Sequence, residues 1–290
     1  MKRAYRVVDV FTKTPFTGNP VAVVLDAQGL DTPAMQAIAR WTNLSETTFV
    51  LPPQNAVADY RLRIFTPRSE LPFAGHPTLG SAHAVLEAGR ATPRNGQLVQ
   101  ECGVGLVALK VEGCGAGRVL SFALPPASQT ALDEADTQEL EAILGVGVDR
   151  VARPLRIDVG PVWIVARLAG VEQLLALQPD SARSVVFENR LGATGISVFA
   201  PHGEGREDIE VRSFAFSQGV AEDPVCGSGN GSVAVFGHVH GLLPPGLVHY
   251  SATQGRCVGR AGRVKVQVAP DGAVQVGGQC VSTVEGYLAG

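Results

Sequence analysis

Two glycine-containing turns carry residue types that bind small anions. A segment of small residues, typical of a buried helix, follows each turn. Glycine leaves the backbone N–H groups at the start of a helix uncovered, and these donors together with the helix dipole attract anions. Facing each other across a cleft, the turns could hold a carboxylate or an enolate oxyanion, although the same glycines could serve only tight turns and close packing. The turns are Ala74-Gly75-His76-Pro77 and Cys226-Gly227-Ser228-Gly229.

Glu46 and His76 are candidates for acid–base chemistry. Glu46 stands directly before the apolar segment Thr47–Leu51, and a carboxylate at the edge of a core strand has a raised pKa when it lines a cleft. His76 stands where a helix begins, which favours its neutral form and lets it donate a hydrogen bond to a substrate. The simpler alternatives are a solvated or capping glutamate and a capping or loop histidine. We assign no role to the remaining histidines, His83, His202, His238, His240 and His249.

Three polar residues around the second turn have equally open roles. Asp223 precedes a proline, so its backbone is extended and its carboxylate could enter a cleft, or it could form an Asx-type turn. Cys226 stands just before a helix, where a thiolate is favoured, or it could be a small buried residue. Ser228 could donate to an anion or cap the helix.

Composition and missing motifs exclude several other functions. The chain of 290 residues has a net charge of −3 and only 24 dispersed Lys and Arg, which argues against a nucleic-acid surface. It has no GxGxxG after a strand, no Walker pattern and no GxSxG, so nucleotide, nicotinamide and serine-hydrolase functions lack support. Five cysteines without a CxxC pair predict neither a disulfide framework nor a zinc site. With no apolar run of about 20 residues and no signal-peptide core, we expect a cytoplasmic protein that does not bind a membrane.

The pattern of elements indicates an α+β chain with two domains and a linker at 124–130. Helical spacing or small-residue runs predict helices at 31–43, His76–Glu87, Ala131–Leu144, Val171–Leu177, Ser181–Asn189 and Gly229–His240. Alternating or β-branched segments predict strands at Tyr5–Phe11, Pro20–Leu25, Thr47–Leu51, Tyr60–Phe65, Gln97–Glu101, Val104–Val111, Val119–Leu124, Val151–Val159, Val162–Leu168, Gly195–Ala200, Ile209–Phe216, Val248–Ala252, Val264–Val268 and Ala273–Val276.

The two halves of the chain resemble each other weakly. Arg63-Ile64-Phe65 precedes the first glycine turn, and Arg212-Ser213-Phe214 precedes the second. The Arg-x-Phe segments lie 149 positions apart and the turns 152, so one three-residue loop insertion reconciles them. This pattern predicts a duplication that gives two similar α+β domains.

Four motifs follow one another along the chain. They are Val8-Asp9-Val10-Phe11 with Phe16-Thr17-Gly18-Asn19-Pro20, Asn43-Leu44-Ser45-Glu46-Thr47, Arg63–Pro67 through Gly75–Ala82, and Glu222-Asp223-Pro224 with Gly227-Ser228. With these motifs the chain resembles the PhzF family of phenazine-biosynthesis-like isomerases and predicted epimerases. The resemblance implies two pseudo-symmetric domains, each a mostly antiparallel sheet wrapped around a central helix, as in diaminopimelate epimerase. It implies domains at 1–124 and 125–280, with 281–290 returning to the first, an active site between them, and no cofactor or metal.

The same resemblance implies roles for individual residues. Glu46 is similar to the catalytic acid/base of the family, and Asp223 also belongs to its catalytic group. The activity implied is that of a cofactor-independent isomerase that moves a proton on a small carboxylate-bearing substrate. We expect a homodimer with no nucleic-acid or membrane partner. The implied substrate-binding residues are Asn19, Gly75, His76, Pro77, Gly227, Ser228 and Gly229.

One segment departs from the family pattern. Members of the family usually carry EDPxTGSA-like residues, whereas this chain has EDPVCGSGNG, in which Cys226 resembles the second thiol of the cofactor-independent epimerases. The position of the first thiol falls at Ala74, so the thiol pair is incomplete. Two alternatives therefore stay open: an epimerase that acts at an acidic α-carbon with Cys226 and Glu46, and a non-catalytic protein that binds small anions.

Overall fold

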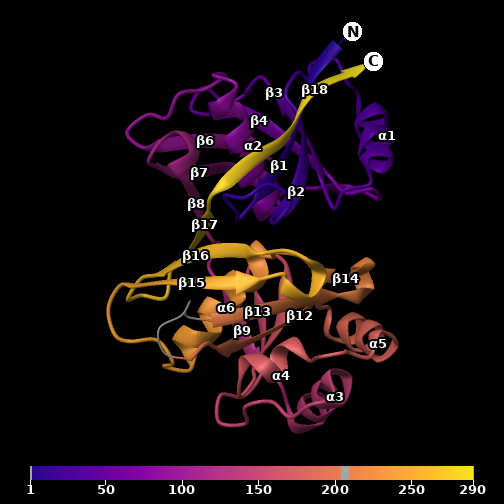
Figure 1. Cartoon of the computed structure of the whole chain (residues 1–290), viewed down its shortest axis with the longest axis vertical. Coiled ribbons are helices and arrows are strands. Elements are labelled where there is room, and N and C mark those ends of the chain that lie inside the picture. The colour runs from indigo at the N-terminus through magenta and orange to yellow at the C-terminus, as the bar shows by residue number, and fades with distance from the viewer. Residues whose placement is uncertain (1, 204–208, 290) are drawn as a thin grey trace. The chain divides into compact units, whose positions relative to one another are not determined.

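The protein folds into two compact units, seen in a computed structural model that describes residues 2–203 and 209–289 (Figure 1). The first unit comprises the chain up to Phe122 together with the segment from Gly277 onward, and the second comprises Ala123–Val276. The chain passes between the units twice, in strands β8 (Val119–Ala123) and β17 (Val274–Gly278). Each unit has the predicted α+β architecture, a mostly antiparallel sheet wrapped around one central helix.

Hydrogen-bonded pairing between neighbouring strands defines the strand order of the first unit. The strands are β1 (Lys2–Val10), β2 (Asn19–Val24), β3 (Thr47–Leu51), β4 (Tyr60–Phe65), β5 (Glu70–Leu71), β6 (Gln97–Cys102), β7 (Gly105–Glu112), β8 and β18 (Cys280–Ala289). They pair in the order β18-β1-β2-β3-β4-β6-β7-β8, and β5 adds to the end of β4. The pairs β2–β3 and β4–β6 are parallel, and the others are antiparallel. The helices are α1 (Thr32–Thr42), α2 (Gly75–Glu87) and the short η1 (Gly115–Gly117).

The second unit repeats this topology. Its strands are β9 (Ser128–Ala131), β10 (Leu155–Asp158), β11 (Val162–Arg167), β12 (Gly195–Pro201), β13 (Ile209–Ala215), β14 (Val220–Asp223), β15 (Val248–Gln254), β16 (Gly262–Val268) and β17. They pair in the order β9-β10-β11-β12-β13-β15-β16, with β11–β12 and β13–β15 parallel and β14 beside β13. The helices are α3 (Glu134–Leu144), α4 (Val171–Leu175), α5 (Ser181–Leu191), α6 (Gly227–Val239), η2 (Phe216–Gln218) and η3 (Arg256–Val258).

Strand register shows which residues of the two units correspond. Thr47 of β3 pairs with Phe65 of β4, and Ile196 of β12 pairs with Phe214 of β13. Thr47 therefore corresponds to Ile196. The duplication predicted from the sequence is present in the topology. The three-residue loop insertion by which the two halves differ corresponds to the turn η2.

Both central helices are buried on nearly every face, which explains their small residues. All eleven residues from His76 to Leu86 of α2 are buried. A Cβ atom on Gly80 would lie 2.3 Å from Val21 Cγ1, and one on Gly231 of α6 would lie 2.3 Å from Leu124 Cδ1. Strands approach these helices too closely for larger side chains.

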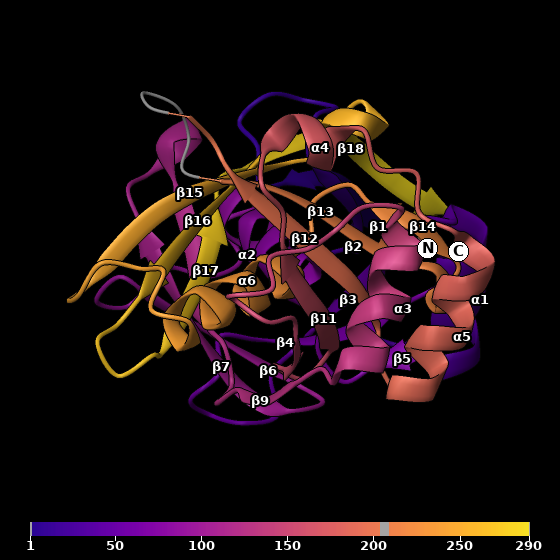
Figure 2. The ribbon, with the colours of Figure 1, turned by 90° about the horizontal axis from the view of Figure 1, so that it is seen from below.

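The outer helices are positioned by their caps. Asp31 caps α1 by accepting a hydrogen bond from Ala34 N (2.9 Å), and Asn43 ends the helix in the left-handed conformation, with φ of 54°. This helix packs Met35 and Ala39 on the first unit's sheet. In the second unit α3 and α5 lie side by side (Figure 2). No helix in the described ranges is long and apolar enough to cross a membrane.

One arginine in each unit braces the loop that leads to the central helix. Arg212 forms two hydrogen bonds with the Glu222 carboxylate, at 3.1 and 2.7 Å, and Arg63 forms two with Glu70, at 2.7 and 2.6 Å. Each guanidinium also lies over the phenylalanine two residues further on. Arg212 is more deeply buried, because its Nη1 also donates to the carbonyls of Leu174 and Leu177, both at 3.0 Å.

The structure differs from the sequence-based expectations at a few elements. The residues up to Ala131 form the edge strand β9, and α3 begins only at Glu134, because Asp133 is its N-cap. The strand expected over Val151–Val159 is confined to Leu155–Asp158. The two short strands β5 and β14 were not predicted, since neither is long enough to show a periodicity.

The difference in burial between the two arginine braces predicts different costs of substitution. Lysine keeps the charge but loses the planar fork, so Arg212→Lys leaves buried carbonyls and a buried carboxylate without donors. We expect it to lower the free energy of unfolding by about 2–3 kcal/mol, and Arg63→Lys by about 1 kcal/mol or less. Urea unfolding of both variants measures this difference. Equal losses would contradict the assignment of Arg212 as the buried brace.

Candidate active site

The Glu46 carboxyl lies beside the first turn of the central helix α2. Its Oε2 atom is 3.2 Å from His76 Nε2, and the two side chains are only 15% and 9% exposed. The local fold places Glu46 there, because α1 ends at Asn43 and the Glu46 carbonyl accepts a hydrogen bond from Ala22 N (3.3 Å). An acid and a histidine predicted from the sequence are thus brought together in the first unit.

Burial controls the electrostatics of this pair. Removal of the Glu46 carboxyl from water raises its pKa from 4.5 to about 7, and a hydrogen bond with the Ser45 side chain only partly opposes this shift. A carboxyl with this pKa is present in both protonated and ionised forms near neutral pH. Such a group can remove a proton from a substrate and also return one.

The other first-unit residues predicted for the site lie around the start of α2 or in the sheet. Ala74 is the N-cap of α2 and has no side-chain acceptor for the first N–H groups. A Cβ on Gly75 would lie 2.9 Å from Phe122 Cζ, so close packing requires this glycine. Pro77 is buried in the first turn, and Asn19 is buried at the start of β2, where it pairs with Val10.

Cys226 is the N-cap of the second central helix, α6. Its sulfur accepts a hydrogen bond from Gly229 N at 3.2 Å and lies 3.6 Å from Ser228 Oγ. Of the two states left open by the sequence, a favoured thiolate and a small buried residue, the surroundings of Cys226 fit the second. Burial, and then the nearby Asp223 carboxylate, raise the pKa of the thiol well above its ordinary value, and the hydrogen bonds from Gly229 and Ser228 do not offset them.

Asp223 and Gln254 hold the backbone of this turn. Asp223 Oδ1 accepts from Val225 N at 3.0 Å, which is the Asx-type arrangement. Gln254 Nε2 donates to the Asp223 carbonyl at 3.0 Å, and Gln254 Oε1 accepts from Cys226 N at 3.1 Å and from Asn230 Nδ2 at 2.8 Å. The sequence analysis missed Gln254, because a single glutamine in a strand carries no signal of its partners.

The glycines of the second turn permit close packing. A Cβ on Gly229 would lie 2.5 Å from Ser197 Oγ and 2.8 Å from Ser213 Oγ, two hydroxyls that are hydrogen-bonded to each other at 2.8 Å. Gly227 is buried in the first turn of α6, whereas Ser228, between the two glycines, is only half-buried. Ser228 is therefore the residue of this turn that reaches toward solvent.

Trp163 is a second residue that the sequence analysis missed. Its indole Nε1 donates a hydrogen bond to Ser228 Oγ at 3.0 Å, across 65 positions of sequence. In the sequence it reads only as an apolar strand residue, so no local signal could have identified it.

The predicted site residues thus form two groups, one in each unit. Glu46, His76 and the start of α2 belong to the first unit, and the turn from Asp223 to Gly229 belongs to the second. That both groups line one cleft stays a prediction. Among the described residues, no cluster of His, Cys, Asp and Glu could hold a metal ion.

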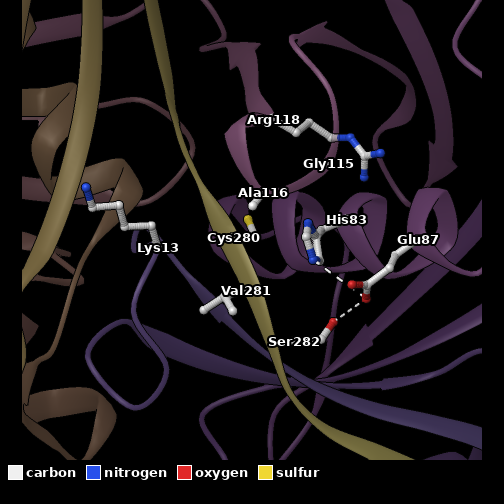
Figure 3. Close-up of a pocket in the computed structure, with 9 residues that line it drawn as sticks. All are labelled: Lys13, His83, Glu87, Gly115, Ala116, Arg118, Cys280, Val281 and Ser282. Atoms are coloured by element: carbon white, nitrogen blue, oxygen red, sulfur yellow. Dashed lines mark hydrogen bonds and ion pairs between the residues drawn. The ribbon is translucent and has the colours of Figure 1, made fainter.

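A cavity of about 240 Å³ in the first unit lies apart from these residues (Figure 3). Its lining includes His83, Glu87, Cys280 and Ser282, and Glu87 Oε2 accepts from Ser282 Oγ at 2.5 Å. His83 follows His76 by seven residues on α2, which corresponds to roughly 10 Å along the helix. The cavity is thus not the surroundings of Glu46.

Two units of one topology, each with a sheet wrapped around a central helix, form the fold that this chain shares with solved structures of PhzF-family proteins and of a probable proline racemase. The chain belongs to the PhzC-PhzF family of phenazine biosynthesis-like proteins, whose family model matches residues 8–286. Its relatives include named isomerases, and the protein is an enzyme of that class.

Three comparisons illustrate this relationship. The chain is 42% identical to antisense-enhancing sequence 1 of Schizosaccharomyces pombe, over 98% of each chain. It is 35% identical to trans-2,3-dihydro-3-hydroxyanthranilate isomerase of Pseudomonas aeruginosa, over 97% of this chain and 98% of the relative. The solved structure of a predicted epimerase from Pseudomonas aeruginosa matches with a TM-score of 0.83 and 31% identity, over 99% of each chain.

The raised pKa of Glu46 predicts how stability depends on pH. The folded chain holds this proton more tightly than the unfolded chain, so the stabilisation is complete below about pH 4.5 and is lost as pH rises through about 7. Relative to Glu46→Gln, the native chain should lose roughly 3 kcal/mol of unfolding free energy across this window. Urea unfolding from pH 4.5 to 8 tests this. The exposed Glu112→Gln variant is the control, and a Glu46→Gln curve parallel to the native one would contradict the assignment.

The elevated pKa of Cys226 predicts that its thiol reacts slowly with alkylating reagents. Iodoacetamide reacts with thiolates, so at pH 8 the exposed Cys114 should be labelled at least about 10-fold faster than Cys226. Peptide mass spectrometry against time measures both rates in one sample. Cys280, which is also buried and whose pKa is raised to about 12, should be similarly slow. Labelling of Cys226 as fast as that of Cys114 would restore the reactive-thiol hypothesis.

Proposed function

We propose that this protein is a cofactor-independent isomerase that moves a proton between atoms of a small carboxylate-bearing substrate, with Glu46 as the acid/base. The observation that supports this most is the buried Glu46 carboxyl, with a pKa of about 7, at 3.2 Å from His76. A carboxyl whose pKa matches neutral pH is efficient in both directions of proton transfer. The name of the isomerase from Pseudomonas aeruginosa supports a substrate of the dihydro-hydroxyanthranilate kind.

The proposed reaction needs only one proton carrier. The Glu46 carboxylate removes a proton from a carbon next to an unsaturated, electron-withdrawing group, and the electron pair of the broken C–H bond delocalises into that group. The protonated Glu46 exchanges its acid proton with water and then gives a proton to a second carbon of the delocalised system. Atoms and charge balance without an oxidant or reductant, and His76 stabilises the carboxylate while it is ionised, before the first step and after the second.

The substrate carboxylate would bind away from the proton carrier. In the proposal, the N-terminal N–H groups of α2 and α6 and the Ser228 hydroxyl donate to it. The uncapped start of α2 and the half-buried position of Ser228 support this role. Gly227 and Gly229 would keep bulky side chains away from the bound anion.

A second candidate is an epimerase in which Cys226 protonates one face of an α-carbon while Glu46 deprotonates the other. The observation that favours it is the position of Cys226 at the N-cap of α6, where Gly229 N donates to its sulfur at 3.2 Å. Ala74, at the corresponding position of α2, has no ionisable group. Cys226 could therefore act only with Glu46 as its partner.

Deuterium incorporation from D₂O tests the proposal. With trans-2,3-dihydro-3-hydroxyanthranilate as substrate, we expect the native protein to exchange a carbon-bound proton, followed by NMR. Glu46→Gln should lower the rate about 10²- to 10⁴-fold, because it removes the proton carrier. Glu112→Gln is the control, since this side chain is exposed on β7, and its rate should match the native rate.

A parallel Cys226→Ser variant separates the alternatives. Loss of exchange in Glu46→Gln alone supports the isomerase, and comparable loss in both variants supports the epimerase. Tight binding of the substrate by the native protein without any deuterium incorporation would contradict both, and would indicate a protein that only binds small anions.

A further inference from the structure

We infer that Trp163 is a positioning residue that commits the Ser228 hydroxyl to donate its proton to the substrate carboxylate. This inference rests on the proposed function and adds a residue to it. Trp163 is almost completely buried on β11, at 3% exposure, and its Nε1 atom lies 3.0 Å from Ser228 Oγ. The residues on either side of Ser228 in α6 are buried, whereas Ser228 is half-buried. Trp163 therefore contacts the hydroxyl from the protein interior, and a ligand can reach the hydroxyl from the solvent side.

The chemistry of the two groups fixes the direction of this hydrogen bond. An indole N–H is a donor only, so Ser228 Oγ must accept. The single proton of the serine hydroxyl is then left for another acceptor. Its other polar neighbour in the structure is Cys226 Sγ at 3.6 Å, a contact in which either atom could be the donor, and sulfur is a weak acceptor. A carboxylate oxygen accepts more strongly, so a bound carboxylate would take this proton from the sulfur.

The duplicated fold shows why a tryptophan fits at this point. Glu46 precedes Thr47, and Thr47 corresponds to Ile196, so the second-unit position that corresponds to Glu46 is Gly195. A Cβ on Gly195 would lie 2.1 Å from the Phe214 carbonyl oxygen and 2.8 Å from Trp163 Cζ3, so the backbone and the indole ring leave no room for a side chain there. Trp163 and Gly195 are also direct partners in the β11–β12 pair. The indole thus packs where the first unit has its acid.

The helical residues that Glu46 and Trp163 contact also occupy corresponding positions. His76 and Ser228 are both the second residue of their central helices. The first unit therefore places a carboxyl beside that helical position, and the second unit places an indole N–H beside it. The first arrangement moves protons. The second lacks an ionisable group at the equivalent point and orients a donor for the anion.

Steady-state kinetics of Trp163→Phe, Ser228→Ala and the double variant test the inference. Phenylalanine keeps most of the buried ring but removes the N–H, so we expect KM for trans-2,3-dihydro-3-hydroxyanthranilate to rise roughly 5- to 10-fold with kcat nearly unchanged. Because Trp163 acts through Ser228, the double variant should be no worse than Ser228→Ala alone. Trp41→Phe, at a surface tryptophan of α1 that is 77% exposed, is the matched control with native KM and kcat. Additive losses in the double variant, or a fall in kcat at native KM, would overturn the inference.

A second measurement does not depend on catalysis. The chain has two tryptophans, so the ¹⁵N–¹H spectrum should contain two indole signals, with Trp41 as the internal reference. Ser228→Ala should shift the Trp163 indole signal and accelerate its exchange with solvent, and should leave the Trp41 signal unchanged. An unchanged Trp163 signal would overturn the inference. Failure of the native protein to incorporate deuterium would instead reject the proposed function, so the two failures are distinguishable.

Discussion

The Glu46 carboxyl is largely buried, and the chemistry of the first unit depends on this burial. An ionised carboxylate at this depth is unfavourable, so the fold shifts its pKa to about 7. His76, fixed in the first turn of an almost completely buried helix, lies 3.2 Å from it. The strands packed around α2 prevent the pair from moving apart into solvent. The close packing of strands against the glycines of α2 therefore contributes to the raised pKa of Glu46.

The two units use one scaffold for different purposes. Both keep an arginine–carboxylate brace on the loop before the central helix, and both bury that helix inside the sheet. They differ where the chemistry would occur, because Glu46 in one corresponds to Gly195 in the other. A duplicated fold offers two equivalent helix N-termini. In this chain one of them faces an acid, and the other faces a neutral indole and a neutral thiol.

Much of the fold could be predicted from the sequence because its signals are local. Asp31 caps α1, and the left-handed Asn43 and Gly145 end α1 and α3, so these boundaries follow from residue type. The strand β9 carried no such signal. Its four residues are all exposed, and they form a strand only because the edge of β10 is available for pairing.

The sequence nominates residues for the candidate site but does not reveal their energetics. Glu46, His76 and Ser228 stand in recognisable motifs, whereas the state of Cys226 depends on burial and on Asp223, which only the tertiary structure reveals. Trp163 and Ser228 lie 65 positions apart, and Gln254 meets Cys226 across 28. Contacts of this range arise from strand order and packing, which no short segment of sequence contains.

Titration of the Glu46 carboxyl tests the central claim most directly. In protein labelled with ¹³C at glutamate side chains, the Glu46 signal can be assigned by its absence from the spectrum of Glu46→Gln. Its chemical shift followed from pH 3 to 9 should show a midpoint near 7, because burial disfavours the charged form. A midpoint near the ordinary value of 4.5 would show that the carboxyl is solvated, and would contradict its assignment as the tuned acid/base.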